Sequence, residues 1–342
     1  MHAFSTVNFF RKPLRLSVLL ILICALFLSG CSRSLKGSSP LEATGFYFDT
    51  VISVRIYSHG SEEILSKCMA LAEHYENLLS PNVEGSDIWK INHSGGQYVA
   101  VSDDTLALLK TALHYAELSD GLVDPTIGSL SQLWNFGSGN QETVPEKSDI
   151  RDALTHVGWH LVEIKGNEVR LTDAKTQIDL GFIAKGFIGD KIKHFLRSQN
   201  VSSALINLGG NVVALGSRPN GSPFRVGVRD PFHTAGEPLL VLDALDLSVV
   251  SSGDYERFFE KDGRRYHHIL STETGYPAKS GLSQVTIISS DAAIADALST
   301  LCFISGYEKA VSLLENHPDI QAVFVTEDGQ ILYANCASDT VD

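Results

Sequence analysis

Segments in which apolar and polar residues alternate, as they do in strands, outnumber segments whose apolar residues have helical spacing. The two kinds of segment do not follow one another in a regular order along the chain. Alternation predicts strands over 46–57, 204–208, 212–215, 224–228, 239–242, 248–251, 285–289, 321–326 and 331–333. Helical spacing predicts helices over 62–79, 104–118, 185–200, 291–305 and 308–317. A doubly wound parallel sheet needs strands and helices to follow one another in turn. The observed order therefore favours an α+β fold with mostly antiparallel sheets and packed helices.

The first thirty residues have the pattern of a secretory signal peptide. Arg11 and Lys12 stand before an almost wholly apolar run over 14–28, which is shorter than the roughly 20 residues that a membrane span needs. The run ends in Leu-Ser-Gly-Cys, where small residues precede Cys31 as in a lipobox. We expect a diacylglycerol group on Cys31, with an uncleaved anchor helix as the alternative.

These features divide the chain into a signal peptide over 1–30, a Ser/Gly-rich tether over 31–44 and one domain over 45–336. We expect the protein to be anchored to the cell membrane through its lipid on the periplasmic side, with the choice between inner and outer membrane open. The chain has 27 Lys and Arg against 40 Asp and Glu and a net charge of −13. Such an acidic protein is a poor candidate for binding nucleic acid, because phosphate neutralisation requires clustered basic residues.

The segment from Ile178 to Phe187 reads as a strand end, a tight turn and a helix start. Such a junction offers backbone N–H groups and the positive end of a helix dipole, and both favour phosphate binding. Asp179 and Lys185 flank the turn with opposite charges. A plain strand-to-helix turn with a surface salt bridge would give the same pattern.

The segment from Asp291 to Thr300 carries a second set of candidate ligands. Asp296 and Thr300 are four residues apart, so they share one face of the predicted helix. A carboxylate and a hydroxyl are hard oxygen ligands of the kind that Mg²⁺ combines with water and substrate phosphates. The alternative is a helix start capped by Asp291, with small residues packed closely.

Two adjacent histidines, His267 and His268, precede a turn of sequence Thr-Gly-Tyr-Pro. A neutral imidazole at the edge of a cleft is a natural acceptor for the proton of a hydroxyl nucleophile. A structural histidine bonded to the backbone is the competing interpretation. The nearby segment from Ser251 to Tyr255 adds hydroxyl groups and a turn.

Taken together and in this order, these segments resemble the ApbE family, the FAD:protein FMN transferases. The resemblance extends over residues 45–335 and includes the segments 48–50, 79–82, 121–128 and 207–211. It implies an ApbE/T-fold-like domain with FAD in a cleft. The family's FAD-binding positions fall on Phe48, Asn82, Leu122, Val123, Asp124, Asp179, Lys185 and Leu270.

The resemblance also implies a magnesium site. The backbone carbonyl of Phe182 and the side chains of Asp296 and Thr300 would hold Mg²⁺. Some family members have a carboxylate where this chain has Ser299, so a ligand role for Ser299 is not implied.

The implied reaction is Mg²⁺-dependent transfer of FMN from FAD to a Thr or Ser hydroxyl of an acceptor protein, with release of AMP. His268 would accept the hydroxyl proton, and the acceptors would be membrane electron-transport subunits. Asn82, in place of a tyrosine, is associated with hydrolysis of FAD to FMN and AMP, so a FAD pyrophosphatase is an alternative. A lipoprotein that binds FAD without turnover is the third possibility.

Overall fold

The computed structural model of the protein describes residues 39–137, 143–233 and 236–336. The predicted signal peptide, Cys31 and most of the predicted tether lie outside these residues. The first strand begins at Leu41, so the last four residues of the predicted tether belong to the sheet. In the part of the chain that the structure describes, no helix is both long and apolar enough to cross a bilayer.

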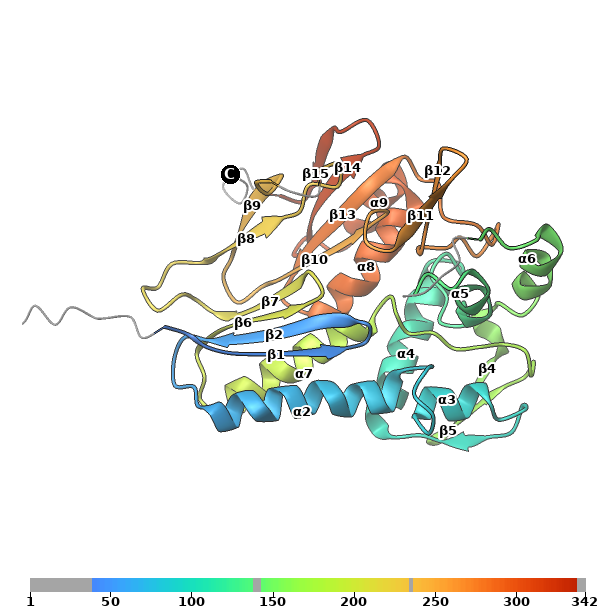
Figure 1. The fold of residues 1–342 in the computed structure, drawn as a ribbon, viewed down its shortest axis with the longest axis horizontal. Helices are drawn as coiled ribbons and strands as arrows, with labels where there is room; N and C mark the ends of the chain where they lie inside the picture. Colours follow the sequence, from blue (N-terminus) through green and yellow to red (C-terminus); the bar gives the residue numbers. More distant parts are fainter. Residues whose placement is uncertain (1–38, 138–142, 234–235, 337–342) are drawn as a thin grey trace, which may run out of the picture. The chain divides into compact units, whose positions relative to one another are not determined.

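The main sheet has eight strands in the order β1-β2-β6-β7-β10-β13-β14-β15 (Figure 1). Every neighbouring pair is antiparallel, as the sequence predicts. The strands are β1 (Leu41–Tyr47), β2 (Thr50–Ile56), β6 (Ser203–Leu208), β7 (Asn211–Gly216), β10 (Ser248–Gly253), β13 (Leu282–Ser289), β14 (Gln321–Thr326) and β15 (Ile331–Ala334).

Residues 46–57, predicted as one strand, instead belong to a β-hairpin. Phe48 and Asp49 form its two-residue turn, with φ angles of 53° and 55°. Two consecutive left-handed residues match the twist of the flanking strands, but this turn is normally built from Asn-Gly or Asp-Gly. The Phe-Asp pair therefore gave no turn signal, and the prediction of a single strand was wrong.

Three small sheets complete the β structure. They comprise β3 (Val99–Ala100) with β5 (Glu168–Leu171) and β4 (Val162–Lys165), β8 (Phe224–Val228) with β9 (Leu240–Ala244), and β11 (Phe258–Lys261) with β12 (Arg264–His267). Of these strands, the sequence predicts β8 and β9. The others are two to four residues long, too short for alternation to stand out.

The five predicted helices are present, with ends within a few residues of the prediction. They are α2 (Glu62–Leu79), α4 (Asp103–Leu118), α7 (Ala184–Ser198), α8 (Ala292–Ser305) and α9 (Tyr307–Leu314). Ser102 caps α4 and Asp291 caps α8, each accepting a hydrogen bond from a main-chain N–H of the first turn. The sequence did not predict α3 (Asp87–Asn92), α5 (Gly128–Trp134), α6 (Lys147–Leu154) and the 3₁₀ helix η1 (Trp159–Leu161).

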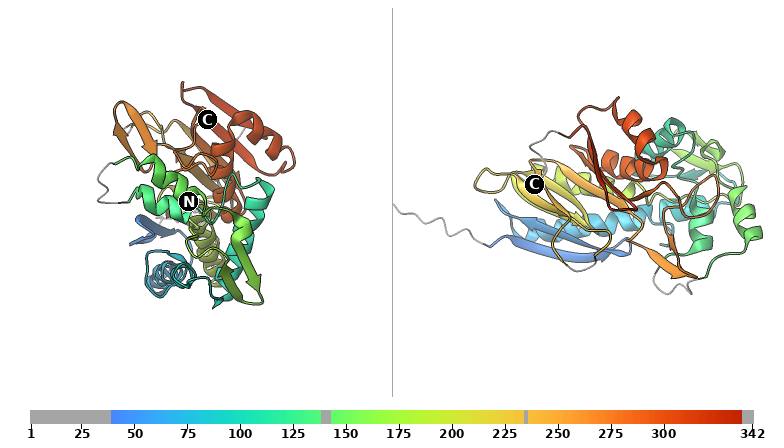
Figure 2. Two further views of the ribbon diagram at one scale, coloured as in Figure 1. Left: turned by 90° about the vertical axis from the view of Figure 1, so that its right-hand side faces the viewer. Right: turned by 90° about the horizontal axis from the view of Figure 1, so that it is seen from above.

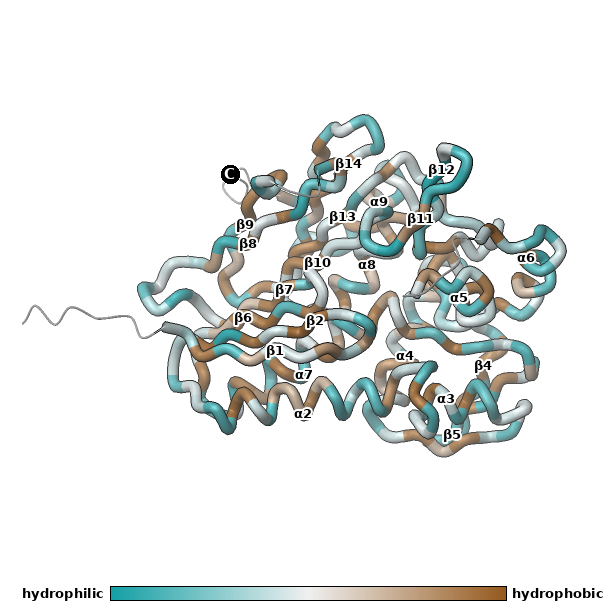
Figure 3. The backbone as a smooth tube through the Cα atoms, in the orientation of Figure 1, coloured by the Kyte–Doolittle hydropathy of each residue, from teal (hydrophilic) through white to brown (hydrophobic). Residues whose placement is uncertain are grey.

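Helices cover one face of the main sheet and a hairpin covers the other. Helix α2 packs on β1 and β2, α7 on β6 and β7, and α8 on β10 and β13 (Figure 1, Figure 2). On the opposite face, Phe224 and Leu242 of the β8–β9 hairpin pack against Val249 and Ile288. Strand β13 is therefore buried along its whole length, and hydrophobic residues gather on the central strands (Figure 3).

Helices α7 and α8 approach most closely at Gly186. A Cβ atom added there would lie 2.1 Å from the main-chain oxygen of Ala292 and 2.7 Å from the Cα of Ala293. Main-chain atoms cannot move aside as a flexible side chain can. A residue without a side chain is thus required where the two helices meet.

Replacing Gly186 by alanine should therefore separate α7 from α8. We expect Gly186→Ala to lower the free energy of unfolding by about 1–3 kcal/mol or more, measured by urea denaturation. The matched control is Gly189→Ala, one turn further along α7. An added Cβ at Gly189 would meet methyl groups of Val213 and Leu208 at 2.9 and 3.1 Å. Because these side chains can shift, Gly189→Ala should lose less free energy of unfolding. Equal losses would contradict the backbone clash at Gly186.

Candidate functional site

One cleft brings together segments from five parts of the chain. Its empty space is about 710 Å³, part of it open to solvent. The walls come from 122–131, the turn before α7, β10 with the residue after Tyr255, the segment 268–272 and the second half of α8. The lining residues are Leu122, Val123, Asp124, Ile127, Ser131, Asp179, Gly181, Phe182, Lys185, Ser251, Ser252, Glu256, His268, Ile269, Leu270, Thr272, Thr300 and Ile304.

Most of the residues predicted for the site line this cleft, including a member of each of the three motifs: Lys185, His268 and Thr300. Phe48, Asn82 and Asp296 are not among the lining residues. The cleft therefore unites the predicted phosphate turn, histidine and hydroxyl ligand, which lie up to 115 residues apart in the chain.

Asp296 lies directly behind the wall of the cleft, with 2% of its surface exposed. One carboxylate oxygen accepts a hydrogen bond from the Gly186 N–H (2.9 Å), and the other accepts one from Asn211 Nδ2 (2.9 Å). The second oxygen also lies 3.7 Å from Lys185 Nζ. Burial raises the pKa of this carboxyl, while Lys185 and the two hydrogen bonds oppose that rise.

Thr300 follows Asp296 by one helical turn and lines the cleft. Its hydroxyl lies 3.1 Å from Ser252 Oγ, which in turn lies 2.7 Å from Ser299 Oγ. Ser299 is fully buried and is not among the lining residues. Within the described ranges, no three His, Cys, Asp or Glu side chains cluster closely enough to hold a metal ion.

The residues present nevertheless fit a magnesium ion that shares its ligands with a substrate. Asp296 Oδ1 already faces a cationic group at the rim of the cleft, since Lys185 is its ion-pair partner. The carboxylate, the Thr300 hydroxyl and the Phe182 carbonyl would supply a few hard oxygen ligands. Mg²⁺ commonly takes its remaining ligands from water and substrate phosphates.

The turn before α7 is held by its own side chains. Asp179 Oδ1 accepts a hydrogen bond from the Gly181 N–H (2.8 Å), and Lys185 Nζ donates to the Gly181 carbonyl (3.4 Å). Lys185 thus pairs with Asp296 rather than with Asp179, unlike the surface salt bridge considered as an alternative. The ammonium group at the first turn of α7 adds positive charge to a helix N-terminus, which suits an anionic ligand.

The two adjacent histidines have different environments. His267 bonds through Nε2 to the Ala278 carbonyl (3.1 Å) and packs edge-on against Phe303. His268 lines the cleft, and its Nδ1 is buried without a hydrogen-bond partner in the described part of the chain. Burial, together with the charges of Arg257 and Lys185, lowers the pKa of His268 to about 3. Its ring is therefore neutral at physiological pH.

Asp124 lines the cleft, but its carboxylate already accepts hydrogen bonds from other residues of the protein. It accepts hydrogen bonds from the N–H and the hydroxyl of Thr126 and from the N–H of Trp159, at 2.6 to 2.8 Å. Burial raises the pKa of this carboxyl, and these hydrogen bonds oppose the rise. Asp124 therefore fixes the chain at one wall of the cleft.

Phe48 and Asn82 are placed outside the cleft lining. Phe48 lies in the β1–β2 turn, where its carbonyl accepts a hydrogen bond from Arg257 Nη2 (3.3 Å). This contact links it to the residue next to Glu256 in the cleft. Asn82 is exposed after α2, and its N–H donates to Ser80 Oγ (3.2 Å).

Glu256 is a lining residue that the sequence did not predict. The residue is exposed as a whole, yet desolvation by the surrounding protein raises the pKa of its carboxyl, with Lys185 opposing the rise and Asp296 adding to it. It directly follows the hydroxyl-rich segment from Ser251 to Tyr255. The only hint in the sequence that Glu256 belongs to the site was its position directly after this turn.

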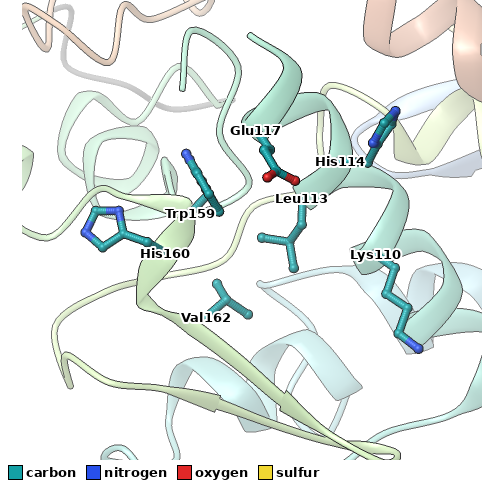
Figure 4. A pocket seen from close by; sticks show the side chains of 7 residues that line it. All are labelled: Lys110, Leu113, His114, Glu117, Trp159, His160 and Val162. Carbon is teal, nitrogen blue, oxygen red and sulfur yellow. The ribbon is translucent and has the colours of Figure 1, made fainter. Parts of the chain in front are cut away.

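A second pocket lies between α4 and the segment 159–162 (Figure 4). Its empty space is about 800 Å³, part of it open to solvent. Its lining residues are Lys110, Leu113, His114, Glu117, Trp159, His160 and Val162. None of the residues predicted for the site lies there, so we place the candidate site in the first cleft despite the larger volume of the second pocket.

Comparison with known proteins agrees with the resemblance seen in the sequence. A model of the ApbE family matches residues 48–324. A FAD:protein FMN transferase of Treponema pallidum is 36% identical over 337 residues, covering 93% of this chain and 92% of that protein. A FAD:protein FMN transferase of Klebsiella pneumoniae is 38% identical over 287 residues, covering 83% of this chain and 88% of that protein.

Solved structures have the same fold. The ApbE protein of Thermotoga maritima gives a TM-score of 0.79 at 34% identity, covering 86% of this chain and 97% of that chain. The flavin transferase ApbE of Vibrio cholerae gives a TM-score of 0.77 at 24% identity, covering 86% and 97%. These likenesses confirm the predicted α+β fold with mostly antiparallel sheets. With most of its length matched by the family model and by relatives above 30% identity, the chain belongs to the ApbE family.

Proposed function

We propose that this protein transfers FMN from FAD to a Thr or Ser hydroxyl of an acceptor protein, in a Mg²⁺-dependent reaction that releases AMP. The observation that carries the proposal is one cleft in which Lys185, His268 and Thr300 meet, with Asp296 directly behind its wall. The relatives named FAD:protein FMN transferases support this activity.

The diphosphate of FAD would bind at the first turn of α7. Lys185 would neutralise part of its charge, and the backbone of the turn after Asp179 would approach it closely. Asp296, Thr300 and the Phe182 carbonyl would hold Mg²⁺, which would neutralise the charge that develops as the bond to AMP lengthens. The apolar walls of the cleft, including Leu122 and Leu270, would position the flavin.

His268 would act as the general base. Its neutral ring can accept the proton of the acceptor hydroxyl, whose oxygen then forms the new bond to the FMN phosphorus. The bond between that phosphorus and the AMP oxygen breaks, and AMP leaves. An anionic diphosphate beside Lys185 would offset the positive charges that lower the pKa of His268, so substrate binding would make the base stronger.

We further propose that the protein works at the cell membrane on the periplasmic side, anchored through a lipid on Cys31. The apolar run before Cys31 and its lipobox support this location. Acceptors in that location would be membrane electron-transport subunits that present a Thr or Ser.

A FAD pyrophosphatase is the second candidate, favoured by asparagine at position 82. Water would then replace the acceptor hydroxyl. Incubation with FAD, Mg²⁺ and a candidate acceptor, followed by mass spectrometry, distinguishes transfer, hydrolysis and binding without turnover. Covalent FMN on the acceptor supports transfer, AMP formed without acceptor supports hydrolysis, and FAD recovered intact would indicate binding without turnover.

Removing the charge of Asp296 should abolish turnover but leave FAD bound. We expect Asp296→Asn to lower the transfer rate by at least about a hundredfold, because a neutral amide holds Mg²⁺ poorly. FAD binding, measured by flavin fluorescence, should persist through Lys185 and the cleft walls. Asp291→Asn is the matched control on the same helix, since asparagine also caps helices well. Normal turnover in Asp296→Asn would remove this residue from the metal site.

Truncating His268 should slow FMN transfer without weakening FAD binding. We expect His268→Ala to lower the rate of transfer by about 10²–10⁴-fold with FAD affinity retained. The adjacent His267 provides the control, because its ring bonds to the Ala278 carbonyl. His267→Gln should cost stability, read from thermal unfolding, while transfer by the folded enzyme continues. A wild-type transfer rate in His268→Ala would discard the assignment of the base.

A further inference from the structure

Three hydroxyl groups form a hydrogen-bonded chain beside the cleft. Ser299 Oγ, on α8, donates to the main-chain carbonyl of Asp296 (2.9 Å). Ser252 Oγ, on β10, lies 2.7 Å from Ser299 Oγ and 3.1 Å from Thr300 Oγ1. Ser252 is 8% exposed and Ser299 is 0% exposed, so water has little access to replace these contacts.

The direction of each hydrogen bond follows from the number of hydrogens. A hydroxyl has one hydrogen to donate and two lone pairs to accept with. The Asp296 carbonyl can only accept, so Ser299 uses its hydrogen there. Ser252 must then donate to Ser299, and the Ser252 oxygen can only accept from Thr300. The hydrogen of Thr300 therefore points toward Ser252, which leaves the lone pairs of Thr300 free toward the cleft.

We propose that Ser252 and Ser299 are positioning residues that orient the Thr300 hydroxyl to coordinate a cation. The inference rests on the proposed function, in which Thr300 is a ligand of Mg²⁺. A hydroxyl binds a metal ion through a lone pair, and a hydrogen pointing into the cleft would oppose that ion. The chain of serines fixes the favourable orientation before the ion arrives, as the partners of metal ligands commonly do.

Metal affinity distinguishes this role from ordinary packing between α8 and β10. The experiment titrates Mn²⁺ into the full chain with FAD present and no acceptor, and follows free Mn²⁺ by EPR. We expect Ser252→Ala and Ser299→Ala each to weaken Mn²⁺ binding by about 10–100-fold, with FAD affinity unchanged. Ser252→Thr keeps the hydroxyl and should retain most of the affinity.

Ser299→Ala is the most informative variant. Ser299 is not among the lining residues of the cleft, and alanine is favourable inside a helix, so the variant should fold even if Ser252→Ala does not. Ser248→Ala is the control: Ser248 lies on the same strand, and its buried Oγ has no hydrogen-bond partner in the described residues. Its Mn²⁺ affinity should equal that of the wild type.

Thr300→Val separates failure of the inference from failure of the proposed function. If Thr300→Val weakens Mn²⁺ binding while Ser252→Ala and Ser299→Ala bind Mn²⁺ like the wild type, the positioning role is overturned and the metal site stands. If Thr300→Val itself binds Mn²⁺ normally, Thr300 is not a ligand, and the proposed metal site falls together with the positioning role.

Discussion

The carboxylate of Asp296 is the contact on which the site depends. It comes from α8 and accepts hydrogen bonds from the backbone of α7 at Gly186 and from Asn211 at the start of β7. Lys185, whose ammonium faces the cleft, is its ion-pair partner. Because hydrogen bonds to a buried charge are strong and costly to lose, this one group fixes the start of α7, helix α8 and strand β7 relative to one another.

The sequence predicted the long elements and the motifs, because periodicity and residue type are local properties. It could not predict which side chains face the cleft. Asp296 and Thr300 share a helix face by spacing, yet Thr300 lines the cleft while Asp296 is bonded behind its wall. That difference depends on Gly186 and Asn211, which lie 110 and 85 residues earlier in the chain. The β1–β2 turn was missed because its Phe-Asp pair is an unusual turn sequence.

The adjacent histidines show how the surroundings assign roles that the sequence leaves open. Both rings are buried enough to have a lowered pKa, about 4 for His267 and about 3 for His268. Each ring keeps a buried Nδ1 without a hydrogen-bond partner in the described structure. His267 bonds through Nε2 to a carbonyl and packs against an aromatic ring, whereas His268 lines the cleft. Residue type alone gives two candidates, and only the packing of the segment 267–278 distinguishes them.

The β11–β12 hairpin leaves and re-enters the cleft wall at nearly the same place. Glu256 and Arg257 precede it, His268 follows it, and the His268 N–H closes its base on the Arg257 carbonyl (3.0 Å). This bond fixes where the hairpin joins the cleft wall. Phe259 and Tyr266 of the hairpin pack against Trp134 in the same cluster as the cleft residue Leu270, so only the solvent-facing positions of the hairpin are free to vary without disturbing the cleft wall.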